Sequence, residues 1–343
     1  MEPSSPPTPL VTVAIPCRDE EAHIEACIRG VQAQDWPGDA LEIVVADGMS
    51  VDATREILAR LASEDPRLRV VDNPARGEAA GVNECIRAAK GAFIVRVDVQ
   101  ADYAPDFVRQ CIAALERTGA DNVGGAPRPI ATTFFQRCVA AAMRSPLMMD
   151  GSPSSSPDSE GFVETAWPGA FRRDVFERVG LFDPNADTSD SAELDQRIVD
   201  AGGRVYQSRD IVAHYHPRPS MRSLARDYFR RGQGRARTLL KHGRLPSVRS
   251  ALPFLGLMGE AAVLVAAPWH IGGLSVVAYV LVTGAEAVRV GRGDGLAGIS
   301  VVWVMFPVLH ASHGAGFASG LVKYALRPDW ERPVRGEAVA AAP

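Results

Sequence analysis

Apolar and polar positions alternate along residues 10–125 in a pattern that predicts strands and helices in turn. Short apolar runs are typical of strands buried on both faces, and the segments between them have the period of amphipathic helices. The predicted strands are Val11–Ile15, Glu42–Ala46, Leu68–Val71, Ala92–Val97 and Asn122–Gly125. The predicted helices are Glu20–Gln34, Asp52–Ala62, Gly77–Ala89 and Asp106–Thr118. Strands that alternate with helices imply right-handed crossovers, so we expect an α/β fold with a mostly parallel sheet.

The pattern changes after residue 125. Ser145–Gly161 is rich in serine and proline, which predicts a long loop. Order then returns with Gly169–Phe171 and with helices over Arg173–Val179 and Ser191–Ala201. We place the α/β domain at 10–217, behind an N-terminus, 1–9, whose composition predicts disorder.

The C-terminal part contains long uncharged stretches, Ala261–Ala285 and Leu296–Val322. Runs of this length are typical of membrane spans, although a pair of buried core helices is the alternative. We expect two to three transmembrane helices within 250–322 and a flexible tail over 323–343. The predicted spans are Ala251–Pro268, Ile271–Val288 and Ala297–Gly320.

A basic helical segment, 218–249, precedes the first predicted span. Four arginines with i, i+4 spacing line one face of this segment: Arg218, Arg222, Arg226 and Arg230. Such a face either attracts anionic lipid headgroups or is a solvated face, and the sequence leaves both open. Basic residues beside a span are typical of the cytosolic side, so we expect a cell (inner) membrane protein with its α/β domain in the cytoplasm.

Composition narrows the class of protein only slightly. The formal net charge of −4 on 343 residues gives no argument for a nucleic-acid partner. The five cysteines form no Cys-x-x-Cys pair, which fits a reducing compartment. No signal-peptide pattern opens the sequence.

Polar groups gather where three predicted strands end. Arg18 and Glu20 follow the first strand, Asp47 and Ser50 follow the second, and Asp98 follows the strand near residue 95. Because ligands of open parallel sheets bind at the carboxyl ends of the strands, we expect a binding site at this edge.

These segments resemble the opening of family 2 glycosyltransferases with a GT-A fold, a Rossmann-like, mostly parallel sheet flanked by helices. The resemblance is carried by Val-Thr-Val-Ala-Ile-Pro-Cys-Arg-Asp-Glu-Glu (11–21), Glu-Ile-Val-Val-Ala-Asp-Gly-Met-Ser-Val-Asp-Ala-Thr (42–54), Asn-Pro-Ala-Arg-Gly-Glu-Ala-Ala-Gly-Val-Asn (73–83) and Val-Arg-Val-Asp (95–98). Later pieces are Trp-Pro-Gly-Ala-Phe-Arg-Arg (167–173), Val-Gly-Leu-Phe-Asp (179–183) and Glu-Leu-Asp-Gln-Arg (193–197). The histidine-containing stretch 310–320 is similar to the last span of the succinoglycan-type exopolysaccharide branch.

The resemblance implies a nucleotide-sugar donor. It assigns the base and ribose to Asp47 and the turn from Pro16 to Glu20, and the phosphates to Arg76. The complete donor set that it implies is Pro16, Arg18, Glu20, Asp47, Ser50, Arg76, Asn83 and Asp98.

A divalent cation, Mg²⁺ or Mn²⁺, is expected on the diphosphate because both ions prefer hard oxygen ligands. The family has Asp-x-Asp at this place, whereas this chain has Asp98 followed by Gln100 and, two residues later, Asp102. The predicted metal ligands are therefore Asp98, Gln100 and Asp102.

Inversion at the sugar carbon needs a general base for the acceptor hydroxyl. Counting back from Leu194 puts the family's aspartate at Ser191, which cannot act as a base unaided. Asp190 is the first candidate and Glu193 the second, although Asp190 is equally placed to cap a helix.

The acceptor side is predicted from weaker signals. The family builds its acceptor pocket at the positions of Trp167 and Gly169, and a loosely matching element contains Arg231 and Arg235. The Gln-x-x-Arg-Trp motif of processive synthases is absent from the sequence, which favours transfer of a single sugar.

We therefore expect a membrane-anchored, inverting glycosyltransferase with a cytoplasmic catalytic domain. The donor is expected to be UDP-linked rather than GDP-linked, and the acceptor to be a lipid-linked sugar or glycolipid. The alternatives are a polyprenyl-phosphate sugar synthase and an inactive nucleotide-sugar-binding scaffold of a polysaccharide assembly.

Overall fold

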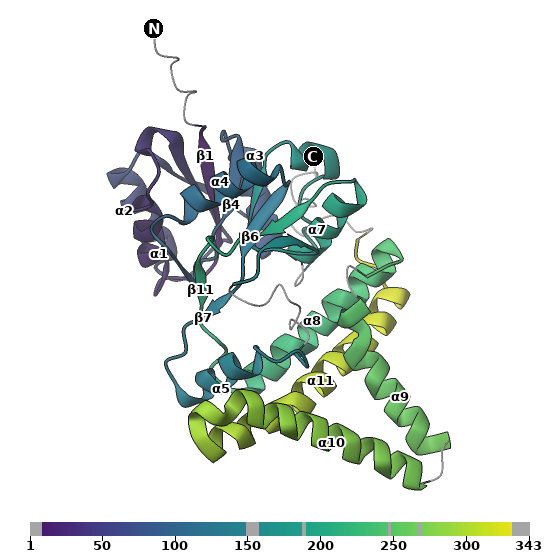
Figure 1. The fold of residues 1–343 in the computed structure, drawn as a ribbon. Coiled ribbons are helices and arrows are strands. Elements are labelled where there is room, and N and C mark those ends of the chain that lie inside the picture. The colour runs from purple at the N-terminus through teal and green to yellow at the C-terminus, as the bar shows by residue number, and fades with distance from the viewer. Residues whose placement is uncertain (1–8, 149–157, 187–189, 246–247, 267–268, 331–343) are drawn as a thin grey trace. The chain divides into compact units, whose positions relative to one another are not determined.

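The computed structural model describes residues 9–148, 158–186, 190–245, 248–266 and 269–330 (Figure 1). The chain divides into two units, which we describe separately. The first contains the described residues of 1–128 and 157–215, and the second those of 129–156 and 216–331.

The first unit is built on a mixed sheet of order β3-β2-β1-β4-β9-β6-β10-β8. Its strands are β1 (Val11–Cys17), β2 (Leu41–Asp47), β3 (Leu68–Asp72), β4 (Phe93–Arg96), β6 (Asn122–Gly125), β8 (Gly161–Val163), β9 (Trp167–Arg172) and β10 (Val205–Gln207). Its helices are α1 (Ile24–Gln32), α2 (Thr54–Glu64), α3 (Glu78–Ala88), α4 (Phe107–Thr118), α6 (Val175–Val179) and α7 (Asp190–Asp200), with a short 3-10 turn, η1 (Gly38–Ala40). The strands β5 (Ala101–Tyr103), β11 (Ala213–Tyr215) and β7 (Arg128–Pro129) form a small second sheet.

The parallel core of this sheet is the part that the pattern predicted. β1 pairs in parallel with β2 and β4, and β2 with β3. β9 breaks the parallel order, because it runs antiparallel to both β4 and β6. β8 runs in the same direction as β9, since β8 is antiparallel to β10 and β10 is parallel to β6. The expected α/β architecture is thus present, with a mixed sheet.

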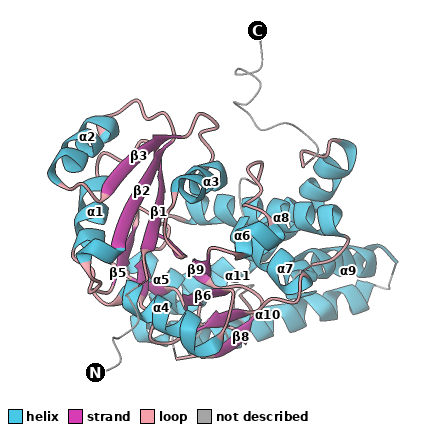
Figure 2. Cartoon of the chain, turned by 90° about the horizontal axis from the view of Figure 1, so that it is seen from above, coloured by secondary structure: helices cyan, strands magenta, loops and turns pink. Residues whose placement is uncertain are grey.

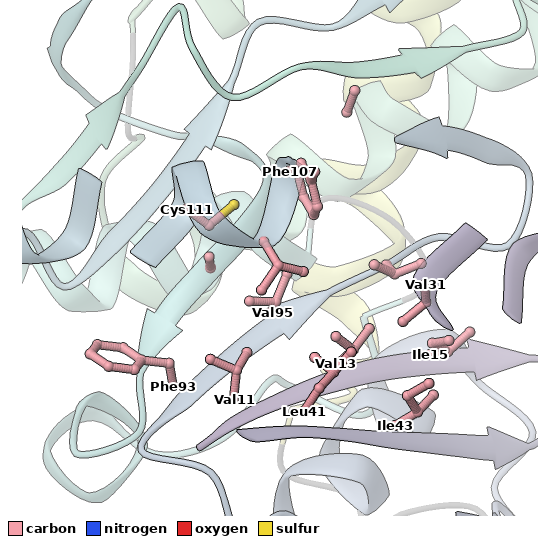
Figure 3. Close-up of a cluster of buried hydrophobic side chains, with 14 of the residues drawn as sticks. Val11, Val13, Ile15, Val31, Leu41, Ile43, Phe93, Val95, Phe107 and Cys111 are labelled. Carbon is pink, nitrogen blue, oxygen red and sulfur yellow. The ribbon is translucent and has the colours of Figure 1, made fainter. Parts of the chain in front are cut away.

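Both faces of the sheet are covered by helices, as Figure 2 shows for β1 to β3 between α1 and α2 on one side and α3 on the other. The alternation of side chains along β1 explains why both faces are covered. Val11, Val13 and Ile15 join the core beneath α1, α2 and α4, whereas Ala14 joins the core beneath α3, α6 and α7. Figure 3 shows the first of these clusters, in which Phe107 and Cys111 of α4 also take part. Burial on both faces accounts for the continuous apolar strands.

The second unit is helical. It contains α5 (Phe134–Ala142), α8 (Met221–His242), α9 (Leu252–Ala266), α10 (Trp269–Gly291) and α11 (Gly295–Leu326), with 3-10 turns η3 (Val248–Ala251) and η4 (Arg292–Asp294). Residues 129–148, which we expected to belong to the α/β domain, group with this unit. The cause is hydrophobic: Cys138 and Val139 of α5 share a buried cluster with Phe306 and Leu309 of α11.

The ends of the expected segments also differ from the prediction. Lys323 to Leu326 continue α11, so helix extends into the expected flexible tail. Most of the expected disordered N-terminus and tail, and much of the predicted 145–161 loop, lie outside the described residues.

The predicted spans correspond to α9, α10 and α11. By length and composition, one described stretch, Gly272–Leu326, is long and apolar enough to cross a membrane. The 15 residues of α9 make a helix of about 22 Å, shorter than a hydrocarbon core of about 30 Å. Exposed apolar side chains nevertheless occur on all three helices: Leu252, Leu255, Leu274, Leu281, Val282, Leu296, Val304 and Val322.

α8 and α11 approach so closely that only small residues fit between them. A Cβ on Gly316 would lie 2.0 Å from the carbonyl oxygen of Phe229, and a Cβ on Gly232 would lie 2.2 Å from that of His313. The backbones of the two helices are therefore in direct contact.

We expect Gly316→Val to destabilise the second unit by about 1–3 kcal/mol, because the added side chain forces α8 and α11 apart. The control is Gly259→Ala, since no atom lies within 4 Å of a Cβ at Gly259. Thermal unfolding of both variants in the same detergent measures the effect. An unchanged Tm for Gly316→Val would contradict the observed contact.

Candidate active site

The carboxyl ends of β1, β2 and β3 meet at one level of the sheet. Cys17 pairs with Asp47, and Asp47 pairs with Asp72. Residue 96 of β4 pairs with Ala14, so Asp98 follows only two residues beyond that pair. The polar strand ends predicted from the sequence therefore lie along one edge.

The loops after β1 and β2 are tied to each other by side chains. The amide of Asp19 donates to Ser50 Oγ (2.9 Å), and the amide of Glu20 donates to Thr54 Oγ1 (2.8 Å). In return, the amide of Val51 donates to Asp19 Oδ1 (2.9 Å). Asp19 and Met49 have positive φ angles of 53° and 59°, which these bonds hold in place. The loops after β1 and β2 therefore form one hydrogen-bonded structure at the edge of the sheet.

Asp47 and Ser50 hold the loop after β2 in its conformation. The carboxylate of Asp47 is fully buried, accepts the amide of Ser50 and lies 3.2 Å from Arg55 Nε. Its oxygens are therefore directed at the loop itself.

The other predicted donor residues divide into two groups. Arg18 is exposed and packs against Gly48, and Arg76 has a positive φ of 64° in the turn before α3. Pro16 is buried beneath α3. Asn83 is also buried, and its amide makes two hydrogen bonds with the backbone of Phe182 (2.8 and 3.0 Å). This clamp occupies the Asn83 amide, so we leave Asn83 out of the proposed donor site.

A buried arginine, Arg96, occupies the centre of the edge. Its Nε donates to Asp98 Oδ1 (3.1 Å) and its Nη1 to Asp190 Oδ2 (3.0 Å), and its Nη2 pairs with Glu78. Burial disfavours the charge of Arg96, but the nearby carboxylates of Asp190, Asp98 and Glu78 raise the pKa of the guanidinium well above its ordinary value. Arg96 therefore stays charged and bridges the carboxylates of Asp98 and Asp190. It was missed from the sequence, although an arginine inside an apolar strand, two residues before Asp98 and on the same face, was an available signal.

Trp167 holds the second oxygen of Asp98. Its indole Nε1 donates to Asp98 Oδ2 (3.1 Å), and the peptide bond to Pro168 is cis. Gly169 follows with a φ of +98°, where a Cβ would collide with the ring of Phe171. The two predicted acceptor positions of β9 therefore lie at the edge beside the predicted cation ligand.

The oxygen ligands of this edge fit a cation that is shared with a diphosphate. Each oxygen of Asp98 accepts one hydrogen bond and has capacity for another. Gln100 donates through Nε2 to Glu20 (2.8 Å), which leaves its amide oxygen as an acceptor, and Asp102 is exposed on β5. Among the described residues, no group of three or more His, Cys, Asp or Glu side chains is arranged to hold a metal ion. A cation with one or two protein carboxylates and phosphate oxygens is the usual Mg²⁺ arrangement.

The two base candidates have different surroundings. Asp190 begins α7, is 15% exposed, and pairs with Arg96, which also donates to Ser191 Oγ (3.0 Å). Glu193 is 1% exposed and receives both Nε and Nη2 of Arg197 (2.9–3.1 Å). Glu193 is thus enclosed in an ion pair with a residue of its own helix, whereas Asp190 pairs with Arg96, which also contacts Asp98.

A further buried carboxyl group, that of Asp195, was not foreseen. It is fully buried and accepts Asn122 Nδ2 (2.6 Å) and the amide of Ala166 (3.2 Å). Burial raises the pKa of Asp195 from 3.8 to about 7, although its hydrogen bonds with Thr165, Asn122 and Ala166 act in the opposite direction, and the charge of Asp190 adds to the rise. A helical aspartate is ordinarily solvated, so the sequence offered no signal for this role.

This pKa predicts a pH-dependent stability. Because the pKa of Asp195 in the folded protein exceeds its ordinary value, folding binds a proton between about pH 4 and pH 7. The contribution to stability is complete below about pH 4 and is lost as the pH rises through 7. Asp195→Asn is expected to abolish this component, which amounts to a few kcal/mol. Thermal unfolding at about pH 5 and about pH 8 checks it; equal pH dependence in the wild type and the variant would disprove it.

The remaining acceptor candidates, Arg231 and Arg235, lie on α8 in the second unit. Arg231 donates through Nε to Asp227 (3.1 Å) and lies over the ring of Tyr228. Asp98 and Trp167 belong to the first unit, so these two arginines come from a different unit.

The fold and this edge define a GT-A glycosyltransferase. The chain belongs to glycosyl transferase family 2, whose model matches residues 12–180. Among similar proteins, the succinoglycan biosynthesis protein ExoA of Rhizobium meliloti (strain 1021) is 35% identical over 243 residues, 70% of this chain and 73% of that protein.

Two further comparisons extend over nearly the whole chain. The dolichyl N-acetyl-alpha-D-glucosaminyl phosphate 3-beta-D-2,3-diacetamido-2,3-dideoxy-beta-D-glucuronosyltransferase of Methanococcus voltae is 23% identical over 327 residues, 92% of this chain and 98% of that protein. The solved structure of the mannosyltransferase PcManGT from Pyrobaculum calidifontis in complex with GDP-Man and Mn²⁺ has a TM-score of 0.63 at 22% identity, covering 94% of this chain and 88% of that one. The latter likeness shows the fold alone.

Proposed function

We propose that this glycosyltransferase transfers one sugar, with inversion, from a UDP-linked donor to a lipid-linked sugar or glycolipid acceptor. The observation that carries the proposal is the row Asp98–Arg96–Asp190, in which one guanidinium joins a carboxylate at the donor edge to a carboxylate at the start of α7. A donor-side oxygen ligand and an acceptor-side base are the two groups that such a transfer requires.

In this mechanism, Asp190 accepts the proton of the acceptor hydroxyl. The acceptor oxygen forms its bond to the anomeric carbon as the bond from that carbon to the diphosphate oxygen breaks, and the nucleoside diphosphate leaves with the electron pair. Asp98, with the amide oxygen of Gln100, would hold the divalent cation, Mg²⁺ or Mn²⁺, which would neutralise charge on the leaving diphosphate. Arg96 and Trp167 keep Asp98 in one orientation.

A membrane location is supported by the second unit. Large apolar side chains are exposed along α9, α10 and α11, and Leu296 is 83% exposed. Many large apolar side chains exposed along helices are typical of a membrane contact. The Methanococcus relative is named for a dolichyl phosphate-linked sugar acceptor, which supports a lipid-linked acceptor here. We place the protein in the cell (inner) membrane with its catalytic unit on the cytoplasmic side.

The donor is tested with the full chain in lipid nanodiscs. Thermal shift is measured against UDP- and GDP-linked sugars, each with Mn²⁺ and with EDTA. A UDP-sugar at 100 times its Kd should add about 2.7 kcal/mol to the free energy of unfolding, only in the presence of the cation. A response to GDP-sugars alone would overturn the donor assignment, and no response to any sugar nucleotide would favour an inactive scaffold.

The acceptor is tested separately by transfer of radiolabelled sugar in the same nanodiscs. Polyprenyl diphosphate-linked sugar should accept the label, and the free sugar should not. Label on polyprenyl phosphate itself would instead identify a polyprenyl-phosphate sugar synthase.

A further inference from the structure

The buried carboxylate of Asp195 has no part in the chemistry proposed above, yet it is closely tied to the active edge. It lies inside α7, and Asn122 of β6, which donates to it, is also fully buried. A charge or polar group in this position is costly unless it is hydrogen-bonded. Its second oxygen accepts the amide of Ala166, the residue immediately before Trp167.

The backbone around Trp167 is tightly enclosed. A Cβ on Gly124 of the neighbouring strand would lie 2.6 Å from the carbonyl oxygen of Trp167. Trp167 thus enters β9 with its backbone held by Gly124 on one side and by the Ala166–Asp195 bond just before it. The position of its indole N–H, 3.1 Å from Asp98 Oδ2, depends on both.

Two series of contacts therefore connect α7 to Asp98. At its first residue, Asp190 holds Arg96, which donates to Asp98 Oδ1. One and a half turns later, Asp195 holds Ala166, and the adjoining Trp167 donates to Asp98 Oδ2. Both oxygens of Asp98 are oriented by groups that this one helix anchors.

We propose that Asp195 is a positioning residue for sugar transfer: together with Asn122 it fixes Ala166 and Trp167, so that the indole N–H orients the Asp98 carboxylate. This rests on the proposed function, because it takes Asp98 as the donor-side ligand. Groups that orient a ligating carboxylate typically alter affinity or activity by roughly 10- to 100-fold when removed.

The chain offers a matched pair of variants. Asp195→Asn retains the shape: its amide oxygen accepts from Ala166, and its amide nitrogen donates to Asn122 Oδ1 once that side chain turns over. Asn122 Oδ1 is a buried atom with no hydrogen-bond partner among the described residues, so it is available for this bond. Asp195→Ala removes both acceptors. Asp195→Ser keeps one hydrogen bond and replaces the alanine variant if that one does not fold.

The test is a double-mutant cycle with Trp167→Phe, which removes the indole N–H and keeps an aromatic ring. kcat/KM for the donor is measured in nanodiscs, well below the Tm of each variant. We expect Asp195→Ala to lower kcat/KM roughly 10- to 100-fold in the wild type but less than about threefold in the Trp167→Phe background. Asp195→Asn should remain within about threefold of the wild type.

Equal losses in both backgrounds would overturn the inference, because a purely structural defect acts independently of the indole. So would a loss in Asp195→Asn as large as that in Asp195→Ala. The Asp98→Ala variant, assayed alongside, separates this from the proposed function. If it stays active, the proposed site is wrong; if it is inactive and the cycle is additive, only the role of Asp195 falls.

Discussion

Asp98→Ala is expected to lower kcat by roughly 10²- to 10³-fold, because the variant loses the carboxylate that would hold the cation, and with it the positive charge that stabilises the leaving diphosphate. The effect should be large because Asp98 is preorganised: Arg96 and Trp167 already hold one oxygen each, at 3.1 Å. The same variant should lose the Mn²⁺-dependent part of the thermal shift with the donor. Steady-state transfer and thermal shift in nanodiscs measure both.

The control for Asp98 is Asp102→Asn. Asp102 lies on β5, exposed, four residues along the chain, and was predicted as a replacement for the missing second aspartate of the motif. We expect the asparagine variant to keep kcat within about threefold, since Asp98 carries the cation. If Asp102→Asn is as inactive as Asp98→Ala, the two carboxylates share the ion. If Asp98→Ala is active, the donor edge has been misassigned.

Asp190→Asn is expected to lower kcat by roughly 10²- to 10⁴-fold with little change in donor affinity. The amide preserves the shape of the side chain, but cannot accept the proton of the acceptor hydroxyl. Donor hydrolysis and sugar transfer, measured together, separate loss of the base from loss of donor binding. Full activity in this variant would remove Asp190 from the mechanism.

Two companion variants sharpen this result. Glu193→Gln breaks a buried ion pair with Arg197, so we expect it to lower the free energy of unfolding by about 3–5 kcal/mol while kcat at low temperature stays near the wild-type value. The exchange Asp190→Ser with Ser191→Asp moves the carboxylate to the family's position. Because Arg96 Nη1 contacts both side chains at 3.0 Å, this exchange should recover part of the activity lost in Asp190→Ser alone.

The sequence and the structure agree best where the chain is locally periodic. The strands near residues 11, 42, 68 and 93 and the helices between them were predicted, because a parallel sheet buried on both faces leaves uninterrupted apolar runs. β5, β8, β10 and β11 were not predicted: each has three residues, too few for a period to show. The grouping of α5 with the helical unit was not predicted, because it depends on a cluster that Cys138 and Val139 form with Phe306 and Leu309, far away in the chain.

The residues of the candidate site also divide into those that local motifs predict and those that depend on distant contacts. Asp98 and Asp190 were predicted from their places in local motifs, and Arg96 could have been predicted from its alternation with Asp98 on one strand. The connection between them could not, because Arg96 and Asp190 are 94 residues apart in the chain. For Asn83, predicted from a donor motif, the structure adds a contact that the motif does not show, because its amide clamps the backbone of Phe182.

By itself, the sequence determined the family, the α/β class and the set of polar strand ends, because these depend on spacing within short segments. Only the tertiary structure decided which of those side chains lie at the edge of the sheet and which are fully engaged in contacts within the fold. Asp47 proved buried within its own loop, Glu193 enclosed by Arg197, and Asp98 held between Arg96 and Trp167. That difference depends on hydrogen bonds between residues distant in the chain, and such bonds leave no periodic pattern in the local sequence.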